Sequence, residues 1–120
     1  MNILIVDDSK SILNYFNIKF RDTIHNTKFY HCPLQALQDK TPFDIIISDF
    51  IMLDMDGFDL IEKLKNLHSD AEYILMSSFV SNDILNKCEE EKITFINKHD
   101  DIEKLMNIIE RKNNEQRTFI

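Results

Sequence analysis

Acidic, hydroxyl and basic side chains stand directly after the short apolar runs of this sequence. The residues concerned are Asp7, Asp8, Asp49, Ser77 and Lys98. If the apolar runs are parallel strands of one sheet, their carboxyl ends meet at one edge, where open α/β sheets form their sites. Carboxylates cannot share a small pocket in the ionised form unless a cation compensates them, because like charges oppose one another's ionisation. The residue set therefore predicts a cation-binding pocket.

An all-oxygen ligand set of this kind suits Mg²⁺, or Mn²⁺ in its place, with several water ligands retained. The cation would attract phosphate oxygens, and the Lys98 ammonium and the Ser77 hydroxyl would contact the same phosphoryl group. A carboxylate that faces the phosphorus can act as a nucleophile and form an aspartyl phosphate. The set is thus suited to phosphoryl transfer onto an aspartate.

Each of these residues also has an ordinary structural alternative. An aspartate after a strand commonly caps a helix or forms a turn. Ser77 would then be a turn hydroxyl, and Lys98 a solvated surface charge. Their joint occurrence at strand ends on one edge of the predicted sheet favours the chemical interpretation.

Short β-rich runs alternate along the chain with segments of helical periodicity. Strands are predicted at Asn2–Val6, Thr27–His31, Asp44–Ser48, Glu72–Met76 and Thr94–Asn97. The first, third and fourth are continuously apolar, as parallel strands covered on both faces must be, whereas the mixed second run suits an edge. This alternation predicts an α/β fold with a parallel sheet and helices on both faces, because right-handed crossovers place them there.

Apolar residues at three- and four-residue spacing mark the helices between and after these strands. The stripes are Ile12–Phe20, Leu34 and Leu37, Leu60–Leu67, Ile84–Cys88 and Ile102–Ile109. Ser9 or Ser11 could cap the first helix, Pro33 could open the second, and Asp100 or Asp101 could cap the last.

Gly57 is the only glycine, so helix C-termini must close without the residue that usually closes them. Asn66, Asn86 or Asn113 could take the left-handed conformation where one is needed. From about Lys112 the chain turns polar, and we expect this tail to fray or to be the stub of a linker.

Length and composition fit one soluble globular domain spanning residues 1–120. The net charge of −7, without a dense Lys/Arg cluster, disfavours direct nucleic-acid binding. No apolar run is long enough to span a bilayer, so membrane insertion is not expected, and the N-terminus lacks the features of a signal peptide. Cys32 and Cys88 form no CxxC motif and are expected to be buried or half-buried free thiols in a reducing, cytoplasmic compartment.

Four segments of the sequence together resemble the response-regulator receiver domains of two-component signalling. They are Ile3-Leu-Ile-Val-Asp-Asp8, Asp49-Phe-Ile-Met-Leu-Asp-Met-Asp-Gly57, Ile74-Leu-Met-Ser-Ser78 and Phe95-Ile-Asn-Lys98. The second segment is the most specific, and the resemblance extends from Ile3 to about Ile109. It implies a flavodoxin-like (βα)5 fold whose parallel strands lie in the order 2-1-3-4-5.

The resemblance also implies a role for each candidate residue. Asp49 would be the phosphoacceptor. Asp8 and Asp49 would bind Mg²⁺ directly, Asp7 mostly through water, and the backbone carbonyl of Ile51 would be a further ligand. Ser77 and Lys98 would contact the phosphoryl group. Phe95 would be the aromatic residue whose rotamer follows the switch, and the alternative is that it is an ordinary core aromatic.

Such a domain is a signalling switch and not a conventional enzyme, although it can promote its own phosphorylation and dephosphorylation. The implied phosphodonor is a histidine kinase or a histidine phosphotransfer protein. A changed face formed by the fourth helix, fifth strand and fifth helix would then bind a downstream target protein or output domain. Because Met1 directly precedes the first strand, a stand-alone, chemotaxis-type receiver is one possibility, and an excised domain of a larger regulator is equally compatible.

Several positions depart from the pattern of the family. Leu53 and His99 replace prolines that are usual there, and we expect the Lys98–His99 peptide to be trans because a cis bond before a non-proline residue is costly. Glu91 and Lys92 stand where Gly-Ala is common, so the turn before the last strand is expected to differ.

Two alternative functions stay open on the sequence. A degenerate receiver would bind partners without accepting phosphate, which the complete set of acidic, hydroxyl and basic residues disfavours. A Mg²⁺-dependent phosphohydrolase with an aspartate nucleophile would carry that residue after the first strand in an Asp-x-Asp arrangement. The adjacent Asp7-Asp8 pair and the lack of room for a cap insertion disfavour it.

Overall fold

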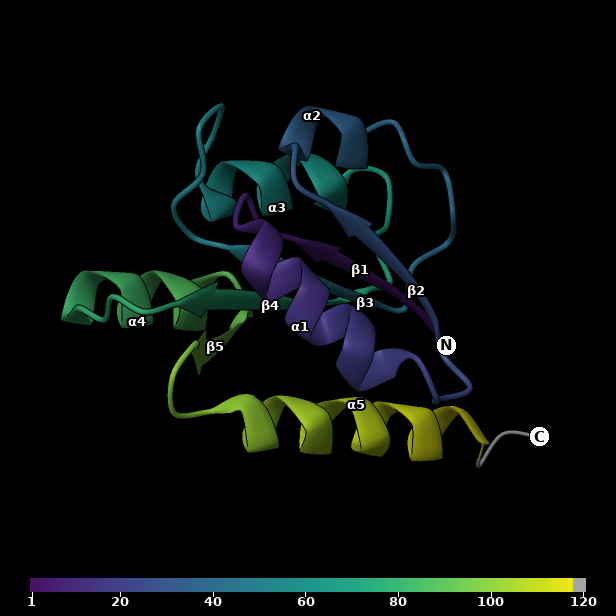
Figure 1. Cartoon of the computed structure of the whole chain (residues 1–120). Coiled ribbons are helices and arrows are strands. Elements are labelled where there is room, and N and C mark those ends of the chain that lie inside the picture. The colour runs from purple at the N-terminus through teal and green to yellow at the C-terminus, as the bar shows by residue number, and fades with distance from the viewer. Residues whose placement is uncertain (118–120) are drawn as a thin grey trace.

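The computed structural model describes residues 1–117, which form a parallel sheet with helices on both faces (Figure 1). The strands are β1 (Asn2–Val6), β2 (Asn26–Tyr30), β3 (Ile45–Asp49), β4 (Glu72–Ser77) and β5 (Thr94–Asn97). The helices are α1 (Lys10–Phe20), α2 (Pro33–Ala36), α3 (Gly57–Lys65), α4 (Asn82–Glu90) and α5 (Ile102–Arg117). The strand order is β2-β1-β3-β4-β5, which confirms the expected flavodoxin-like arrangement.

The three central strands are the continuously apolar ones, and their side chains are buried on both faces of the sheet. β1 pairs with β3 and β3 with β4 in parallel, so that Ile5 lies opposite Ile47 and Ile47 opposite Ile74. The mixed strand β2 is at the edge and is only partly buried. β1 and β5 have the predicted bounds. β2 begins and ends one residue earlier than predicted, β3 begins and ends one residue later, and β4 ends one residue later.

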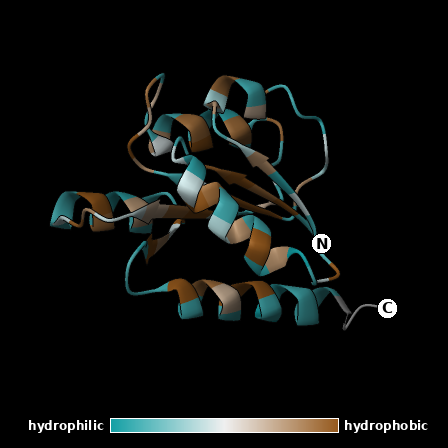
Figure 2. Cartoon of the chain, viewed as in Figure 1, coloured by the Kyte–Doolittle hydropathy of each residue, from teal (hydrophilic) through white to brown (hydrophobic). Residues whose placement is uncertain are grey.

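Alternating side chains of the strands build two apolar layers. In Figure 2 the inner strands are hydrophobic in colour, whereas the helices carry both hydrophobic and hydrophilic residues. Helices α1 and α5 cover one face, and α2, α3 and α4 cover the other (Figure 1). The first layer includes Ile3, Ile5, Phe16, Phe20 and Leu105, and the second includes Leu4, Val6, Leu60, Leu64 and Ile84. No helix within residues 1–117 is both long enough and apolar enough to cross a membrane.

The predicted starting residues are observed for α1 and α2, whereas the Asp101 carboxylate before α5 is bonded to Asn97. Ser9, not Ser11, caps α1 through its hydroxyl, which accepts from the Ile12 N–H at 3.4 Å, and Pro33 is the first residue of α2. Asp101, one of the two predicted caps, stands directly before α5, and its carbonyl accepts from the Leu105 N–H at 3.0 Å. Its carboxylate accepts from the Asn97 N–H at 3.0 Å.

Helix α5 continues to Arg117, past the position near Lys112 where fraying was expected. Arg111 forms an ion pair with Glu72 at 2.7 Å, and the Gln116 side-chain amide donates to Asp44 at 2.9 Å. These contacts attach the polar end of α5 to residues at the amino ends of β3 and β4. Residues 118–120 of the predicted tail lie outside the described residues.

Lys92, between α4 and β5, is the one non-glycine residue with a positive φ, 59°, among residues 1–117. The asparagines proposed for this role do not take it, and Asn66 ends α3 with a φ of −71°. An L-residue pays about 1 kcal/mol or more in the left-handed region, where glycine pays none. The turn thus keeps a left-handed residue even without glycine.

We therefore expect Lys92→Gly to raise the free energy of unfolding by about 1 kcal/mol. Urea denaturation monitored by circular dichroism measures the change. The control is Glu90→Gly in the last turn of α4, which should lower stability by about the same amount because its backbone is helical. A Lys92→Gly variant less stable than wild type would contradict the strain at this turn.

His68, in the loop before β4, is buried with no hydrogen-bond partner for Nε2 among the described residues. Its ring lies edge-on to Phe43 at 5.3 Å between centroids. Burial lowers the pKa of His68; the charge of Asp39 opposes this shift and that of Lys40 adds to it.

The lowered pKa predicts that stability falls as the pH drops below about 6.5. In that range His68 is protonated in the unfolded chain but stays neutral in the folded protein. His68→Leu removes this linkage. Its free energy of unfolding in urea, relative to that of wild type, should therefore rise as the pH is lowered from 7 to 5, because only wild type loses stability through His68. Because both proteins keep His25, whose pKa burial also lowers, the comparison isolates His68. A difference that stays constant with pH would contradict the assignment.

Candidate functional site

The candidate residues gather at the carboxyl edge of the sheet. Asp7 follows β1, Asp49 is the last residue of β3, Ser77 is the last of β4, and Lys98 follows β5. Because these four strands are neighbours in the strand order, the sheet brings the four side chains to one place.

Asp7, Asp8 and Asp49 each offer a carboxylate oxygen to a common point. The three oxygens lie within 4.8 Å of one another. Asp7 is fully buried, Asp49 is 6% exposed, and Asp8 is open to solvent. Two buried carboxylates with an open third one fit a hard divalent cation that keeps water ligands on its outer side. The donor set and its spacing are therefore compatible with Mg²⁺.

The Lys98 ammonium group lies between two of these carboxylates. Its Nζ atom is 2.7 Å from Asp7 Oδ2 and 2.9 Å from Asp49 Oδ1, and its side chain is largely buried. Burial lowers the pKa of Lys98, but the hydrogen bonds to Asp7 and Asp49 outweigh burial and raise it overall. Lys98 therefore stays charged and neutralises part of the acidic pocket.

The surroundings of Asp49 disfavour the ionised form of its carboxyl group. Burial, together with the charges of Asp7 and Asp8, raises the pKa of Asp49 to about 6, against the opposing effect of Lys98. A further cation beside these oxygens would favour the ionised form and so produce a better nucleophile. The electrostatics of the pocket thus couple cation binding to the reactivity of Asp49.

The orientation of Asp7 is set by the chain that follows it. Asp7 Oδ1 accepts from the Ser9 N–H at 2.9 Å, while Oδ2 contacts Lys98. Ser9 also caps α1, so the same turn that starts this helix aims the carboxylate into the pocket.

Ser77 is buried, and its hydroxyl oxygen accepts from the Phe79 N–H at 2.9 Å. The hydroxyl proton is then available for an acceptor in the pocket. The Lys98 N–H donates to the Ser77 carbonyl at 3.1 Å, which joins the loops after β4 and β5.

The remaining candidates, Ile51 and Phe95, lie on the loop after β3 and on β5. The Ile51 side chain is 64% exposed on the loop after β3. Phe95 is half-buried on β5, packed on the face that carries α3 and α4. The Lys98–His99 peptide is trans, as expected without a proline. The Asn97 side chain accepts from the His99 N–H at 2.9 Å and closes this turn.

Gly57 contributes to the site through its missing side chain, a role that sequence reasoning did not assign. A Cβ atom at Gly57 would lie 2.4 Å from the Asp49 carbonyl oxygen and 2.5 Å from Leu75 Cδ1. The Gly57 N–H donates to the Phe50 carbonyl at 2.7 Å. One feature of the sequence could have pointed to this role: Gly57 is the only glycine of the chain, and it ends the most specific motif.

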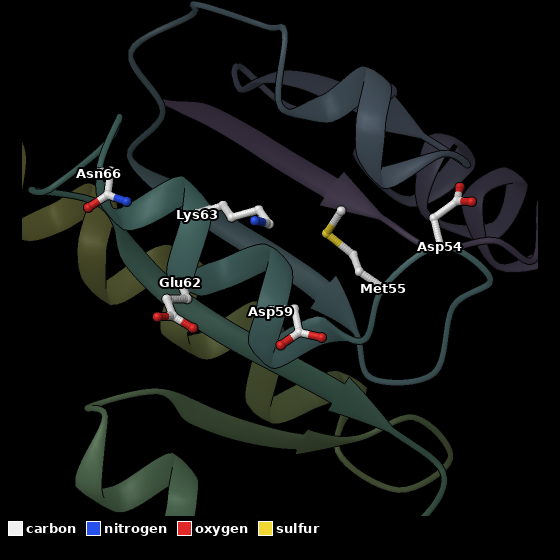
Figure 3. A pocket seen from close by; sticks show the side chains of 6 residues that line it. All are labelled: Asp54, Met55, Asp59, Glu62, Lys63 and Asn66. Atoms are coloured by element: carbon white, nitrogen blue, oxygen red, sulfur yellow. The ribbon is translucent and has the colours of Figure 1, made fainter.

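A surface hollow of about 470 Å³ lies elsewhere. Figure 3 shows its lining side chains on the loop before α3, on α3 itself and on the residue that follows this helix. They are Asp54, Met55, Asp59, Glu62, Lys63 and Asn66. None of the candidate residues lines this hollow, so it is not the chemical site.

Comparisons with known proteins agree with this geometry. The sequence model of the response regulator receiver domain matches residues 3–110. The two-component response regulator ORR21 of Oryza sativa subsp. indica is 34% identical over 91 residues, which are 72% of this chain and 13% of that protein. This chain thus spans only a small part of that relative.

Two solved structures share the fold at low sequence identity. The signal receiver domain of an HD-domain-containing protein from Pseudomonas fluorescens Pf-5 superposes with a TM-score of 0.85 at 22% identity, over 98% of this chain and 97% of that chain. A CheY-like receiver domain protein from Methanospirillum hungatei JF-1 gives 0.84 at 22% identity, over 99% and 98% of the two chains. With the family match over residues 3–110, the conclusion is that this chain belongs to the response regulator receiver domain family.

Proposed function

We propose that this chain is a phosphoacceptor switch of a two-component or phosphorelay system in which Asp49 accepts a phosphoryl group from a phosphohistidine. The donor would be a histidine kinase or a histidine phosphotransfer protein. The observation that carries the proposal is the Lys98 ammonium held between Asp7 and Asp49, at 2.7 and 2.9 Å, with Asp8 open beside them. The two free thiols, Cys32 and Cys88, support a reducing compartment, and we place the chain in the cytoplasm.

In this proposal the chain's own residues hold the cation and perform the transfer. Asp7, Asp8, Asp49 and the Ile51 carbonyl would bind Mg²⁺, with Mn²⁺ as a substitute. When bound, the ion supplies positive charge that neutralises the carboxylates and the phosphoryl oxygens. An Asp49 carboxylate oxygen attacks phosphorus, the bond from phosphorus to the histidine nitrogen breaks, and the imidazole leaves with its electron pair.

The phosphoryl group then gives Lys98 and Ser77 a new partner. Lys98 exchanges a carboxylate contact for a phosphoryl oxygen, and the Ser77 hydroxyl donates its free proton to another. Because the Ser77 oxygen also holds the Phe79 N–H, movement of Ser77 moves the loop after β4. Phe95 turns into the vacated space, and α4, β5 and α5 present a changed face to a downstream target or output domain.

The test uses purified protein, Mg²⁺ and a small phosphodonor such as acetyl phosphate or phosphoramidate. Intact mass spectrometry should show one added phosphoryl group in wild type, none in Asp49→Asn, and none when EDTA removes the metal. A folded wild-type protein that binds Mg²⁺ but gains no phosphoryl group would contradict the proposal and favour a degenerate, phosphorylation-independent binding module. Continuous release of phosphate from a generic phosphate ester would instead indicate a phosphohydrolase.

We further expect the phosphorylated form to lose phosphate slowly. The Ile51 and Phe79 side chains, 64% and 57% exposed, stand two residues after Asp49 and Ser77, and neither can hydrogen-bond an attacking water molecule. Ile51→Asn supplies an amide that can orient this water and should shorten the half-life of the phosphorylated form by roughly tenfold. The decay is followed by mass spectrometry after removal of the phosphodonor.

The matched control is Leu53→Asn, which places the same amide on the same loop at a residue that is 93% exposed. Its half-life should equal that of wild type. Rapid decay of wild type without a phosphatase, or no acceleration in Ile51→Asn, would show that these apolar side chains do not limit hydrolysis.

A further inference from the structure

Ser48 is a fully buried polar residue inside a strand whose other interior residues are isoleucines. Burying a hydroxyl group costs free energy unless it is hydrogen-bonded. The Ser48 hydroxyl donates to the backbone carbonyl of the next residue, Asp49, at 2.9 Å. The buried hydroxyl group of Ser48 thus hydrogen-bonds the backbone of the candidate phosphoacceptor, Asp49.

The bond fixes one end of the peptide group that joins Asp49 to Phe50. The other end of the same peptide is the Phe50 N–H, which donates to the Met76 carbonyl of β4 at 2.9 Å. With its oxygen held by Ser48 and its nitrogen held by β4, this peptide plane cannot rotate freely. The plane follows directly on the Asp49 Cα atom, which carries the reacting carboxylate.

The surroundings leave little space in which this carbonyl could move. Gly57 lies so close that a Cβ atom there would be 2.4 Å from the Asp49 oxygen. The Gly57 N–H in turn holds the Phe50 carbonyl at 2.7 Å, so the next peptide is fixed as well. Ser48 and Gly57 together set the path of the chain from Asp49 to Ile51.

We propose that Ser48 is a positioning residue for phosphoryl transfer: its hydroxyl fixes the Asp49–Phe50 peptide and thereby orients the Asp49 carboxylate and the Ile51 carbonyl. The proposal rests on the proposed function, in which Asp49 is the nucleophile and both groups bind the cation. Ser48 itself touches neither the phosphoryl group nor the metal.

Ser48→Cys keeps a side chain of similar size but replaces a strong donor with a weak one, and Ser48→Ala removes the donor. Both should bind Mg²⁺ about tenfold more weakly than wild type and take up phosphoryl groups from acetyl phosphate about tenfold more slowly. The control, Ile47→Val, removes one methyl group from the neighbouring buried position. It should lower the urea midpoint while leaving Mg²⁺ affinity and phosphorylation rate unchanged.

Mg²⁺ affinity is measured by isothermal titration calorimetry at a temperature where all variants are folded. A purely structural Ser48 would change the urea midpoint alone, as Ile47→Val does. Ser48→Cys with wild-type Mg²⁺ affinity and wild-type rate would overturn the positioning role, even if Ser48→Ala failed to fold. A wild-type protein that takes up no phosphoryl group would instead overturn the proposed function, so the two failures are distinguishable.

Discussion

A Lys98→Met variant is expected to take up phosphoryl groups from acetyl phosphate at least about a hundredfold more slowly than wild type. Lys98 is the ammonium group that contacts Asp49, at 2.9 Å, and in the proposed reaction it stabilises the charge that develops on the transferred phosphoryl oxygens. Methionine keeps much of the length and volume of the side chain but cannot supply this charge. Intact mass spectrometry over time measures the rate.

The same substitution should destabilise the metal-free protein by about 3 kcal/mol, because it leaves Asp7 and Asp49 buried without their shared cation. Mg²⁺ should therefore raise the urea midpoint of Lys98→Met by more than it raises that of wild type. The control is Lys104→Met on the exposed surface of α5, which should change neither rate nor stability. A Lys98→Met protein with a rate within about threefold of wild type would contradict the role of Lys98 in transfer.

The second large effect is expected for Gly57→Ala, which should lower the free energy of unfolding and displace the backbone of Asp49. The added methyl group would lie 2.4 Å from the Asp49 carbonyl oxygen and 2.5 Å from Leu75. The Leu75 side chain could rotate away, but the Asp49 oxygen belongs to the backbone of a central strand and cannot. We expect the free energy of unfolding to fall by about 3 kcal/mol or more, as overpacking of a rigid site does.

Gly57→Ala should destabilise the protein because the new methyl group would lie too close to the Asp49 carbonyl oxygen. Backbone strain is not the cause, since the φ of Gly57 is not positive. A separate control, Ala36→Gly in α2, removes a methyl group without creating a clash and should cost only about 1 kcal/mol from helix propensity plus a small loss of packing. Urea denaturation compares the two variants. In folded Gly57→Ala protein, a displaced Asp49 backbone should also weaken Mg²⁺ binding. A variant as stable as wild type would show that the loop before α3 can shift freely.

Much of the fold followed from local pattern. Continuously apolar runs such as Ile45–Ile47 allow only a strand covered on both faces, so the central strands and the carboxyl edge could be located within about one residue. Residue type at that edge then located the acidic pocket. The strand order came from resemblance to a family, because no local pattern determines which strands are neighbours.

The features that escaped prediction depend on contacts between distant residues. The end of α5 is helical because Arg111 reaches Glu72, 39 positions earlier in the chain, which no local composition encodes. Lys92 takes the left-handed conformation although an asparagine would pay less for it, since the chain must turn there into β5. The position of Lys98 between Asp7 and Asp49 also joins residues that are far apart in the chain.

The pairing of Ser48 with the Asp49 carbonyl also escaped prediction, although the two residues are adjacent in the chain. A serine before an aspartate at a strand end looks like any small residue, and only the structure shows where its hydroxyl points. Sequence could therefore name the reactive side chains, whereas the groups that hold the backbone around them needed three-dimensional geometry.

The central claim is that Asp49 carries the phosphoryl group, and chemical trapping tests it most directly. Protein phosphorylated with acetyl phosphate and Mg²⁺ is treated with borohydride, which reduces an acyl phosphate to an alcohol and so converts aspartyl phosphate into homoserine. Peptide mass mapping then locates the homoserine. We predict homoserine at position 49 and unchanged aspartate at Asp7 and Asp8. Homoserine at position 7 or 8 would contradict the account. So would phosphorylated protein in which residue 49 is still an aspartate after the borohydride treatment.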